Sequence, residues 1–286
     1  MTQNLDKRLH AYRDDLADAE LRGLVEAGRF VDGEPSHIGV AVCNLKRRPA
    51  ASAGTDTQLK RNEAVIVFDE ADDWSWVKAA GDGYVGYVPS MALKKGAPPE
   101  PTQRICAPRT FCYPEPDLKV PPVETLSIGT NVCAIDRAET RGTPYTKLAT
   151  GGWVFAHHLS PIDTVGADYV AVAETLLGTP YLWGGNTAFG IDCSGLVQLS
   201  MSMCGKQVSR DSDMQFETLG VLVNNPDDLQ RGDLIFWKGH VAIVRDENTI
   251  IHANAHSMMV NIESTADAIE RIAYLYAEPI GYKRPD

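Results

Sequence analysis

One stretch constrains the fold more than any other, the run from Gly178 to Gly205 (GTPYLWGGNTAFGIDCSGLVQLSMSMCG). It begins with turn-forming glycines and a proline and continues in apolar residues at helical spacing. Cys193 therefore stands where a loop becomes a helix, and Asp192 is placed to cap that helix. The free N–H groups and the positive end of the helix dipole favour a thiolate there. The pattern predicts a reactive cysteine, although most free cysteines are small apolar fillers.

A thiolate nucleophile needs a base, and the base needs a group that orients it. Residues 232–244 (GDLIFWKGHVAIV) predict two apolar strands joined by a tight turn, and the second strand begins at His240. Residues 249–256 (TIIHANAH) predict a third short strand that carries His252. Consecutive strands with short turns are usually hairpin neighbours, so the two histidines can lie side by side. His256 is a competitor that we assign to a loop.

Several further motifs accompany the cysteine in a fixed order, and together they resemble the NlpC/P60 family of cell-wall cysteine peptidases. The resemblance covers about residues 165–286 and implies a papain-like fold. It also implies that Cys193 is the nucleophile, His240 the base and His252 the third member of a triad that cleaves murein stem peptides at the γ-D-glutamyl bond. The motifs are YLWGG at 181–185, DCSGL at 192–196, RDS at 210–212 with Gln215, GDL at 232–234 and HVA at 240–242.

Residues 38–163 have a different character, with short β-type runs broken by turns. Residues 86–93 (GYVPSMAL) align without gaps on residues 152–159 (GWVFAHHL), and residues 59–65 align on residues 126–132. This pattern indicates a tandem repeat of a β unit of about 60 residues. Each unit resembles a bacterial SH3-like barrel. The fold class expected is therefore α+β, a papain-like domain preceded by two small SH3-like β-barrels.

The chain is longer than a usual single domain, so several domains are expected. Apolar residues from Leu5 to Ala19 recur at spacings of four and three, which predicts an amphipathic helix. The predicted organisation is an N-terminal helical arm (1–37), a first barrel (38–97), a second barrel (98–163) and the catalytic domain (164–286).

Charge and composition argue against several classes of binding partner and cofactor. The net charge of −11 argues against nucleic acid and against anionic membrane surfaces as partners. The six cysteines include no CxxC pair, so we expect reduced thiols, no metal and no other cofactor. The N-terminal residues carry charges throughout, with no apolar run typical of a signal peptide or membrane span. We therefore expect a cytoplasmic protein, and protein partners are not indicated.

The chemistry suggests further site residues around the nucleophile. Amide cleavage needs donors to the developing oxyanion, which the backbone N–H of Cys193 and the Tyr181 hydroxyl can supply. A packed aromatic is the equally weighted alternative for Tyr181. Asp192 and Ser194 flank the nucleophile, so their side chains can reach the acyl side of a substrate.

The RDS motif offers two more candidates for binding substrate. Arg210 and Ser212 can contact D-Glu or diamino-acid carboxylates, because a guanidinium matches carboxylate geometry. The alternative for Arg210 is an internal pair with one of three carboxylates, those of Asp211, Asp213 and Asp233.

Members of the family built with SH3-like barrels and no signal peptide are similar to dipeptidyl-peptidase VI type enzymes, which act on murein peptides already released from the wall. A dipeptide-releasing enzyme must recognise a free amino terminus, and the first barrel can supply that recognition through Asp56 and through Tyr84 or Tyr87, with Asp192 contributing from the other side. The expected partners are therefore small murein peptides. Two alternatives stay open: an N-acetylmuramoyl-L-alanine amidase, and a non-enzymatic murein-peptide binding protein.

Overall fold

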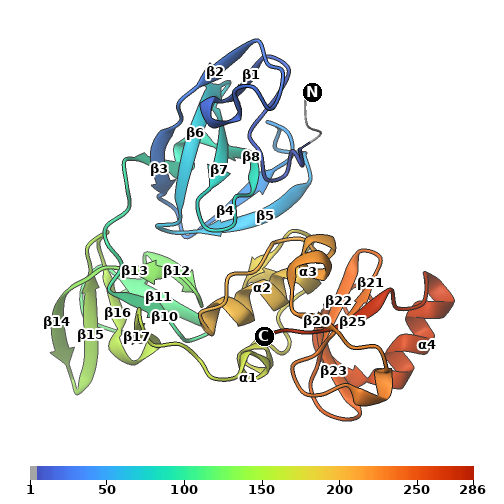
Figure 1. Ribbon diagram of the computed structural model, residues 1–286. Helices are drawn as coiled ribbons and strands as arrows, with labels where there is room; N and C mark the ends of the chain where they lie inside the picture. Colours follow the sequence, from blue (N-terminus) through green and yellow to red (C-terminus); the bar gives the residue numbers. More distant parts are fainter. Residues whose placement is uncertain (1–4) are drawn as a thin grey trace. The chain divides into compact units, whose positions relative to one another are not determined.

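The computed structural model describes residues 5–286, and the chain divides into two units, residues 1–163 and 164–286 (Figure 1). The division falls where the sequence places the start of the catalytic domain. The first unit holds two β modules, and the second holds a six-stranded sheet with α-helices. Each unit has its own core of buried apolar residues.

The first β module is a seven-stranded sheet in the order β5-β4-β8-β7-β6-β3-β9. Alternate residues of its strands, such as Val65 and Val67 in β6, point into one core, as a half-buried strand requires. A 3-10 turn, η2 (Ser90–Ala92), joins the last two strands. The strands are β3 (Glu34–Ile38), β4 (Val42–Lys46), β5 (Thr55–Lys60), β6 (Ala64–Ala71), β7 (Trp74–Ala79), β8 (Val85–Pro89) and β9 (Leu93–Lys95).

The second β module divides its strands between two sheets, β12-β11-β16-β15-β14 and β13-β10-β17. Its core contains Ile105, Leu126, Leu148 and Val154. The 3-10 turn η3 (Ala156–His158) precedes its last strand. The strands are β10 (Gln103–Ile105), β11 (Arg109–Tyr113), β12 (Glu124–Ser127), β13 (Asn131–Val132), β14 (Ala134–Thr140), β15 (Thr143–Leu148), β16 (Trp153–Phe155) and β17 (Leu159–Pro161).

The two modules repeat the same local structure where the sequences align. β8, η2 and β9 correspond in order to β16, η3 and β17. Ile38 pairs with Leu93 in the first module, and Ile105 pairs with the aligned Leu159 in the second. The predicted tandem repeat is therefore confirmed.

Closure of the two predicted barrels is not found. In residues 34–95, all of which the structure describes, β5 and β9 are edge strands that do not pair with each other, so the sheet stays open. In residues 103–161, likewise described throughout, the strands form two separate sheets. The alternation of apolar residues is the same in an open sheet and a closed one, so the sequence pattern could not distinguish them.

The prediction of an N-terminal helical arm is wrong for residues 5–37, which the structure describes. Residues 1–4 of the predicted arm lie outside the described residues. The segment forms a parallel pair, β1 (Leu16–Asp18) with β2 (Arg29–Val31), and the 3-10 turn η1 (Ala19–Leu21). Ala11 and Leu16 pack with Trp76 of the first module. The apolar residues of this segment are extended and are buried against the first module. The spacing had suggested that they form one face of a helix.

The charged side chain of Arg13 also holds the segment before β1 against the first module. The Arg13 guanidinium lies over the Trp76 ring, 4.4 Å from its centroid, and pairs with Asp69 at 2.6 Å. Strand β3 begins at Glu34, so the first module starts before residue 38, the predicted boundary.

The second unit is built on an antiparallel sheet in the order β20-β25-β21-β22-β23-β24. Helix α2 packs against β22 and β23, whereas Ala268 and Ile272 of α4 share a core with alternate residues of β21, β22 and β23. The strands are β18 (Asn186–Thr187), β19 (Gly190–Ile191), β20 (Val221–Leu222), β21 (Leu234–Trp237), β22 (His240–Val244), β23 (Thr249–Asn254), β24 (Met259–Ser264) and β25 (Gly281–Arg284); the helices are α1 (Tyr169–Glu174), α2 (Cys193–Met203), α3 (Ser212–Thr218), α4 (Thr265–Leu275) and the 3-10 turn η4 (Pro226–Asp228).

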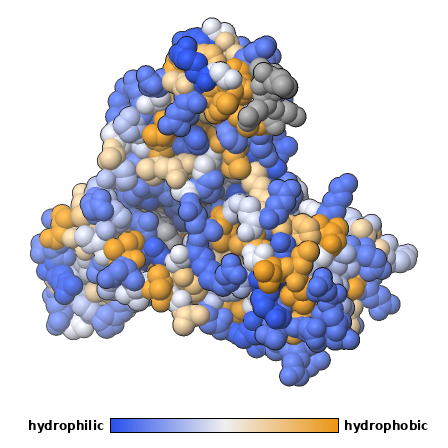
Figure 2. All heavy atoms as spheres, in the orientation of Figure 1, coloured by the Kyte–Doolittle hydropathy of each residue, from blue (hydrophilic) through white to orange (hydrophobic). Residues whose placement is uncertain are grey.

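The surface on the face shown in Figure 2 mixes hydrophilic residues with smaller hydrophobic areas. No helix within residues 5–286 has both the length and the apolar character required to cross a membrane. Over the same residues, no group of three or more His, Cys, Asp or Glu side chains is placed to hold a metal ion.

Candidate active site

Cys193 is the first residue of helix α2, as the sequence predicts. Asp192 caps this helix, because its Oδ1 accepts a hydrogen bond from the backbone N–H of Gly195 at 2.7 Å. The helix ends before Gly205, which has a φ of 76° that suits glycine. The backbone N–H groups of Ser194 and Val241 hydrogen-bond to the sulfur and lower the pKa of the thiol, against a larger effect of burial. The sulfur therefore lies at the start of β22, beside the residue that follows His240.

The two histidines lie on neighbouring strands of the same sheet. β21 and β22 form a hairpin whose tight turn contains Gly239 at a φ of 77°, and β22 pairs in turn with β23. His240 Nε2 and His252 Nδ1 are 2.9 Å apart. The side chain of His252 is fully buried, so its ring is held in one place by its surroundings. The structure thus brings together the predicted base and the predicted third member of the triad.

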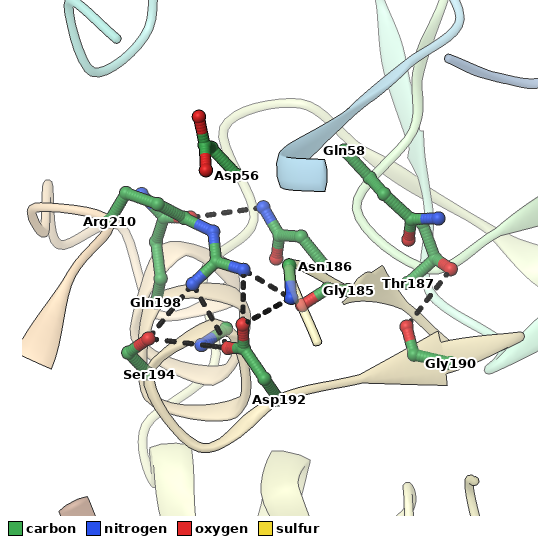
Figure 3. Close-up of polar contacts among 12 residues, drawn as sticks. Asp56, Gln58, Gly185, Asn186, Thr187, Gly190, Asp192, Ser194, Gln198 and Arg210 are labelled. Atoms are coloured by element: carbon green, nitrogen blue, oxygen red, sulfur yellow. Dashed lines mark hydrogen bonds and ion pairs between the residues drawn. The ribbon is translucent and has the colours of Figure 1, made fainter. Parts of the chain in front are cut away.

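Arg210 occupies the interior instead of a binding surface (Figure 3). Its guanidinium donates to both carboxylate oxygens of Asp192, at 2.7 and 3.0 Å, and to Ser194 Oγ at 2.8 Å. The Asp192 carboxylate also accepts from the backbone N–H of Gly184 at 2.9 Å. The internal ion pair of Arg210 is therefore made with Asp192, which was not among the three carboxylates that the sequence suggested.

This network changes the interpretation of Asp192, Ser194 and Arg210. All three are buried, and each makes hydrogen bonds to the others. The network fixes the start of α2 to the glycine loop, so these side chains position the nucleophile. Their predicted direct contact with substrate stays a prediction, and it is weakened for Arg210, whose side chain is only 1% exposed.

Burial dominates the electrostatics of the nucleophile and the base. Burial, followed by the charge of Asp192, raises the pKa of the Cys193 thiol to about 12. Desolvation of the His240 ring, followed by the charge of His252, lowers its pKa to about 3. Burial thus opposes the thiolate that the helix start favours, and a thiolate at Cys193 stays a prediction.

Tyr181 lies near the nucleophile and is partly buried. Burial raises the pKa of its hydroxyl, and the charges of Cys193 and Asp192 raise it further. The hydroxyl therefore keeps its proton at neutral pH and is available as a donor. Its role toward an oxyanion stays a prediction.

The other predicted binding residues have the following places. Ser212 is the first residue of α3 and is partly exposed, and its role stays a prediction. Tyr84 is buried in the core of the first module, and its contact with substrate stays a prediction. Asp56 accepts a hydrogen bond from Arg47 at 2.6 Å, and its contact with a substrate ammonium stays a prediction.

Two residues that extend the histidine pair were not predicted from the sequence. Glu263 Oε1 lies 2.6 Å from His252 Nε2, and Arg271 donates to the same oxygen at 2.5 Å. The hairpin register could have indicated Glu263, because Ile250 pairs with Glu263 and His252 is thus its diagonal neighbour. That register is set by the turn at residues 255–258, whose length the sequence pattern did not determine.

We expect His252→Gln to keep measurable activity and His252→Ala to lose much more. An amide oxygen can accept from the His240 ring as an imidazole nitrogen does, whereas alanine leaves the ring unoriented. Steady-state kcat/KM of the two variants checks this expectation. Equal losses in both would show that position 252 does more than orient His240.

We also expect His240 to make stability depend on pH. Because its folded pKa of about 3 is below the ordinary value, the unfolded state binds a proton that the folded state does not. The contribution of His240 to the free energy of unfolding is complete above the unfolded pKa and is lost as the pH falls. The loss is about 2 kcal/mol between pH 7 and pH 5. Urea unfolding of His240→Gln should show a free energy of unfolding without this loss between pH 7 and pH 5. The same pH dependence in both proteins would contradict the assignment.

Comparison with known proteins identifies two domains in the chain. Residues 178–276 match the NlpC/P60 family, and residues 45–93 match the bacterial dipeptidyl-peptidase Sh3 domain. The chain therefore contains an NlpC/P60 domain that follows a bacterial SH3 domain. The SH3 match lies in the first β module, and the SH3 assignment of the second module stays a prediction.

Two curated relatives carry related names. Dipeptidyl-peptidase 6 of Lysinibacillus sphaericus is 32% identical over 162 residues, which are 52% of this chain and 59% of that protein. The gamma-D-glutamyl-L-lysine dipeptidyl-peptidase of Bacillus cereus (strain ATCC 10987 / NRS 248) is 28% identical over 234 residues, which are 72% of this chain and 69% of that protein. The chain thus spans less than two thirds of the first of these relatives.

A solved structure shares the fold over most of the chain. The crystal structure of an NlpC/P60 family protein from Bacillus cereus ATCC 10987 superposes with a TM-score of 0.72, covering 88% of this chain and 99% of that chain. The sequence identity is 23%, so this likeness establishes the fold.

Proposed function

We propose that this protein is a cysteine peptidase that cleaves the γ-D-glutamyl–diamino acid bond of free murein peptides of the type L-Ala-γ-D-Glu-diamino acid, in the recycling of cell-wall peptides in the cytoplasm. The observation that supports the proposal best is the hydrogen-bonded pair of His240 and His252. His240 begins β22, and the backbone N–H of the next residue, Val241, hydrogen-bonds to the Cys193 sulfur. The name of the Bacillus cereus relative supports the choice of bond, and the names of both relatives support the release of a dipeptide.

The reaction follows from the geometry of these residues. Cys193 Sγ attacks the γ-carbonyl carbon of D-Glu, and its proton passes to His240 Nδ1, since Nε2 faces His252. The backbone N–H of Cys193 and the Tyr181 hydroxyl are the candidate donors to the oxyanion. The imidazolium of His240 then protonates the leaving amine as the C–N bond breaks. Water, deprotonated by the same ring, hydrolyses the thioester and releases the dipeptide.

Product analysis tests the proposal. The full chain is incubated with L-Ala-γ-D-Glu-L-Lys, with the meso-diaminopimelate analogue and with a muropeptide that retains N-acetylmuramic acid, and products are identified by mass spectrometry. We expect L-Ala-D-Glu and the free diamino acid from the two unblocked peptides. Release of the sugar would instead indicate an amidase, and binding without products would indicate a binding protein. Either result would overturn the proposal.

Blocking the substrate amine is expected to slow the reaction. If the enzyme releases dipeptides, it must recognise a free ammonium group, and acetylating L-Ala leaves the recognising group without its partner. We expect kcat/KM to fall by about 10²-fold for the acetylated peptide. Comparable rates for the blocked and the free peptide would show that the amino terminus is not recognised.

A further inference from the structure

The hydrogen bonds of the histidine pair continue beyond His252. His252 Nε2 lies 2.6 Å from Glu263 Oε1, and the same oxygen accepts from Arg271 at 2.5 Å. Together with the 2.9 Å contact of His240 Nε2 to His252 Nδ1, these contacts form one unbranched series of four side chains. The series starts beside the nucleophile and ends on helix α4.

The fold places each member of the series. Glu263 is the last residue but one of β24, and Ser264, which follows it, caps α4. Arg271 lies on the face of α4 that carries Ala268 and Ile272, which pack into the core of the sheet. That face therefore holds the guanidinium over the end of β24, against the Glu263 carboxylate.

The direction of each hydrogen bond follows from the carboxylate. Glu263 has a lowered pKa, because its hydrogen bonds to His252 and Arg271 and the charge of Arg271 act against its burial. An ionised carboxylate only accepts, so the uncharged His252 ring must carry its proton on Nε2. Its Nδ1 is then an acceptor, which requires the uncharged His240 ring to carry its proton on Nε2 as well. The remaining lone pair of His240 is on Nδ1, the nitrogen that must take the thiol proton.

We propose that Glu263 is a positioning residue for the reaction, which fixes the tautomers of His252 and His240 through this series and stabilises the imidazolium of His240. The inference rests on the proposed cysteine peptidase function. Arg271 has the supporting role of holding the carboxylate in place and in its charged form.

The charges around His240 agree with this role. The charged side chains next to the pair are Glu263 from β24 and Arg271 from α4, and the Trp237 ring of β21 lies 5.6 Å from the His240 ring between centroids. Desolvation, His252 and Arg271 lower the pKa of His240, and the charge of Glu263 raises it. Among these groups, Glu263 is thus the one that favours a proton on the base during the reaction.

The first test reads the tautomers directly and needs no turnover. In Cys193→Ala protein labelled with ¹⁵N-histidine, the ring ¹⁵N shifts at neutral pH should show the Nε2–H form for both His240 and His252. We expect Glu263→Leu in the same background to populate the Nδ1–H form of His252 to a substantial extent. A His252 proton on Nδ1 with Glu263 present, or unchanged shifts in Glu263→Leu, would overturn the proposal.

The second test uses the pH dependence of kcat/KM in the active enzyme. We expect Glu263→Leu to lower kcat/KM by about 10- to 100-fold, and Glu263→Gln, which keeps an acceptor oxygen, to lose less. Both variants lack the negative charge, so the imidazolium of His240 loses its proton more readily. His240 must be uncharged to accept the thiol proton, so its titration sets the acidic limb of the profile, and this limb should move to lower pH by about one unit.

A matched control is Glu270→Gln on the exposed side of α4, which should change neither the rate nor the acidic limb. Thermal unfolding of each variant shows whether it folds. A loss of rate in Glu263→Gln with an unmoved acidic limb would mean that Glu263 only supports the structure, and would overturn the proposal. If no murein peptide is cleaved at all, the proposed function fails, and the tautomer measurement still decides the role of Glu263.

Discussion

Replacing Cys193 with alanine is expected to lower kcat by at least about 10⁴-fold while the protein stays folded. The sulfur is the atom that forms the thioester, and neither His240 nor water can replace it in that step. The change removes one atom, and the cap of the helix, which Asp192 provides, does not use it; only the hydrogen bonds of the Ser194 and Val241 backbone N–H groups to the sulfur are lost. Steady-state kinetics with L-Ala-γ-D-Glu-L-Lys, together with thermal unfolding, provides the measurement.

Cys204→Ala is the matched control for this variant. Cys204 is the C-cap residue of the same helix, at the end opposite the nucleophile, and is partly exposed. Its replacement should leave the rate nearly unchanged. Retention of more than trace activity in Cys193→Ala would remove Cys193 from the role of nucleophile.

Arg210→Met is expected to reduce the free energy of unfolding by about 3 to 5 kcal/mol. The substitution leaves the Asp192 carboxylate buried without the guanidinium that now donates to both of its oxygens. The hydrogen bond of the same guanidinium to Ser194 is lost as well, which loosens the start of α2. Urea unfolding in the Cys193→Ala background measures the effect without interference from activity.

Arg231→Met serves as the comparison for Arg210→Met. Arg231 pairs with Asp168 at 2.8 Å on the surface, where both side chains are about 40% exposed, and such pairs contribute less than about 1 kcal/mol. A small loss of stability in Arg210→Met, accompanied by a large rise in KM, would restore Arg210 to the substrate-binding role that its motif suggested.

The elements around the nucleophile could be predicted because local signals define them. Cys193 and Gly205 mark the start and stop of α2 through capping and a positive φ, and the residues at 238 and 239 form the turn that starts β22 at His240. Each of these signals acts within a few residues of chain. The pairing of His240 with His252 then followed from the short connection between their strands.

The N-terminal segment shows why spacing alone was not sufficient. Leu16 lies in a strand and packs with Trp76 of the first β module, a residue far away in sequence. The apolar spacing fits a helix as well as it fits this extended segment, and tertiary packing decided between them. Whether each β module closes into a barrel also depends on pairing between strands that are distant in sequence, which apolar spacing does not reveal.

The roles of buried polar residues were the hardest to predict. Arg210 has the right chemistry for binding a carboxylate, and it does bind one, that of Asp192. The protonation of Cys193 depends on how completely the fold excludes water from the thiol, which capping signals do not reveal. Glu263 became visible only through the register of β23 with β24.

The most direct test of the central claim is to trap the covalent intermediate on Cys193. Rapid acid quenching of the full chain with L-Ala-γ-D-Glu-L-Lys, followed by intact-protein and peptide mass spectrometry, should show a thioester-linked L-Ala-D-Glu acyl group on the peptide that contains Cys193, and none in Cys193→Ala. The acyl group should form and decay at rates consistent with turnover. Turnover without any acylation of Cys193, or with the acyl group on another residue, would contradict the account.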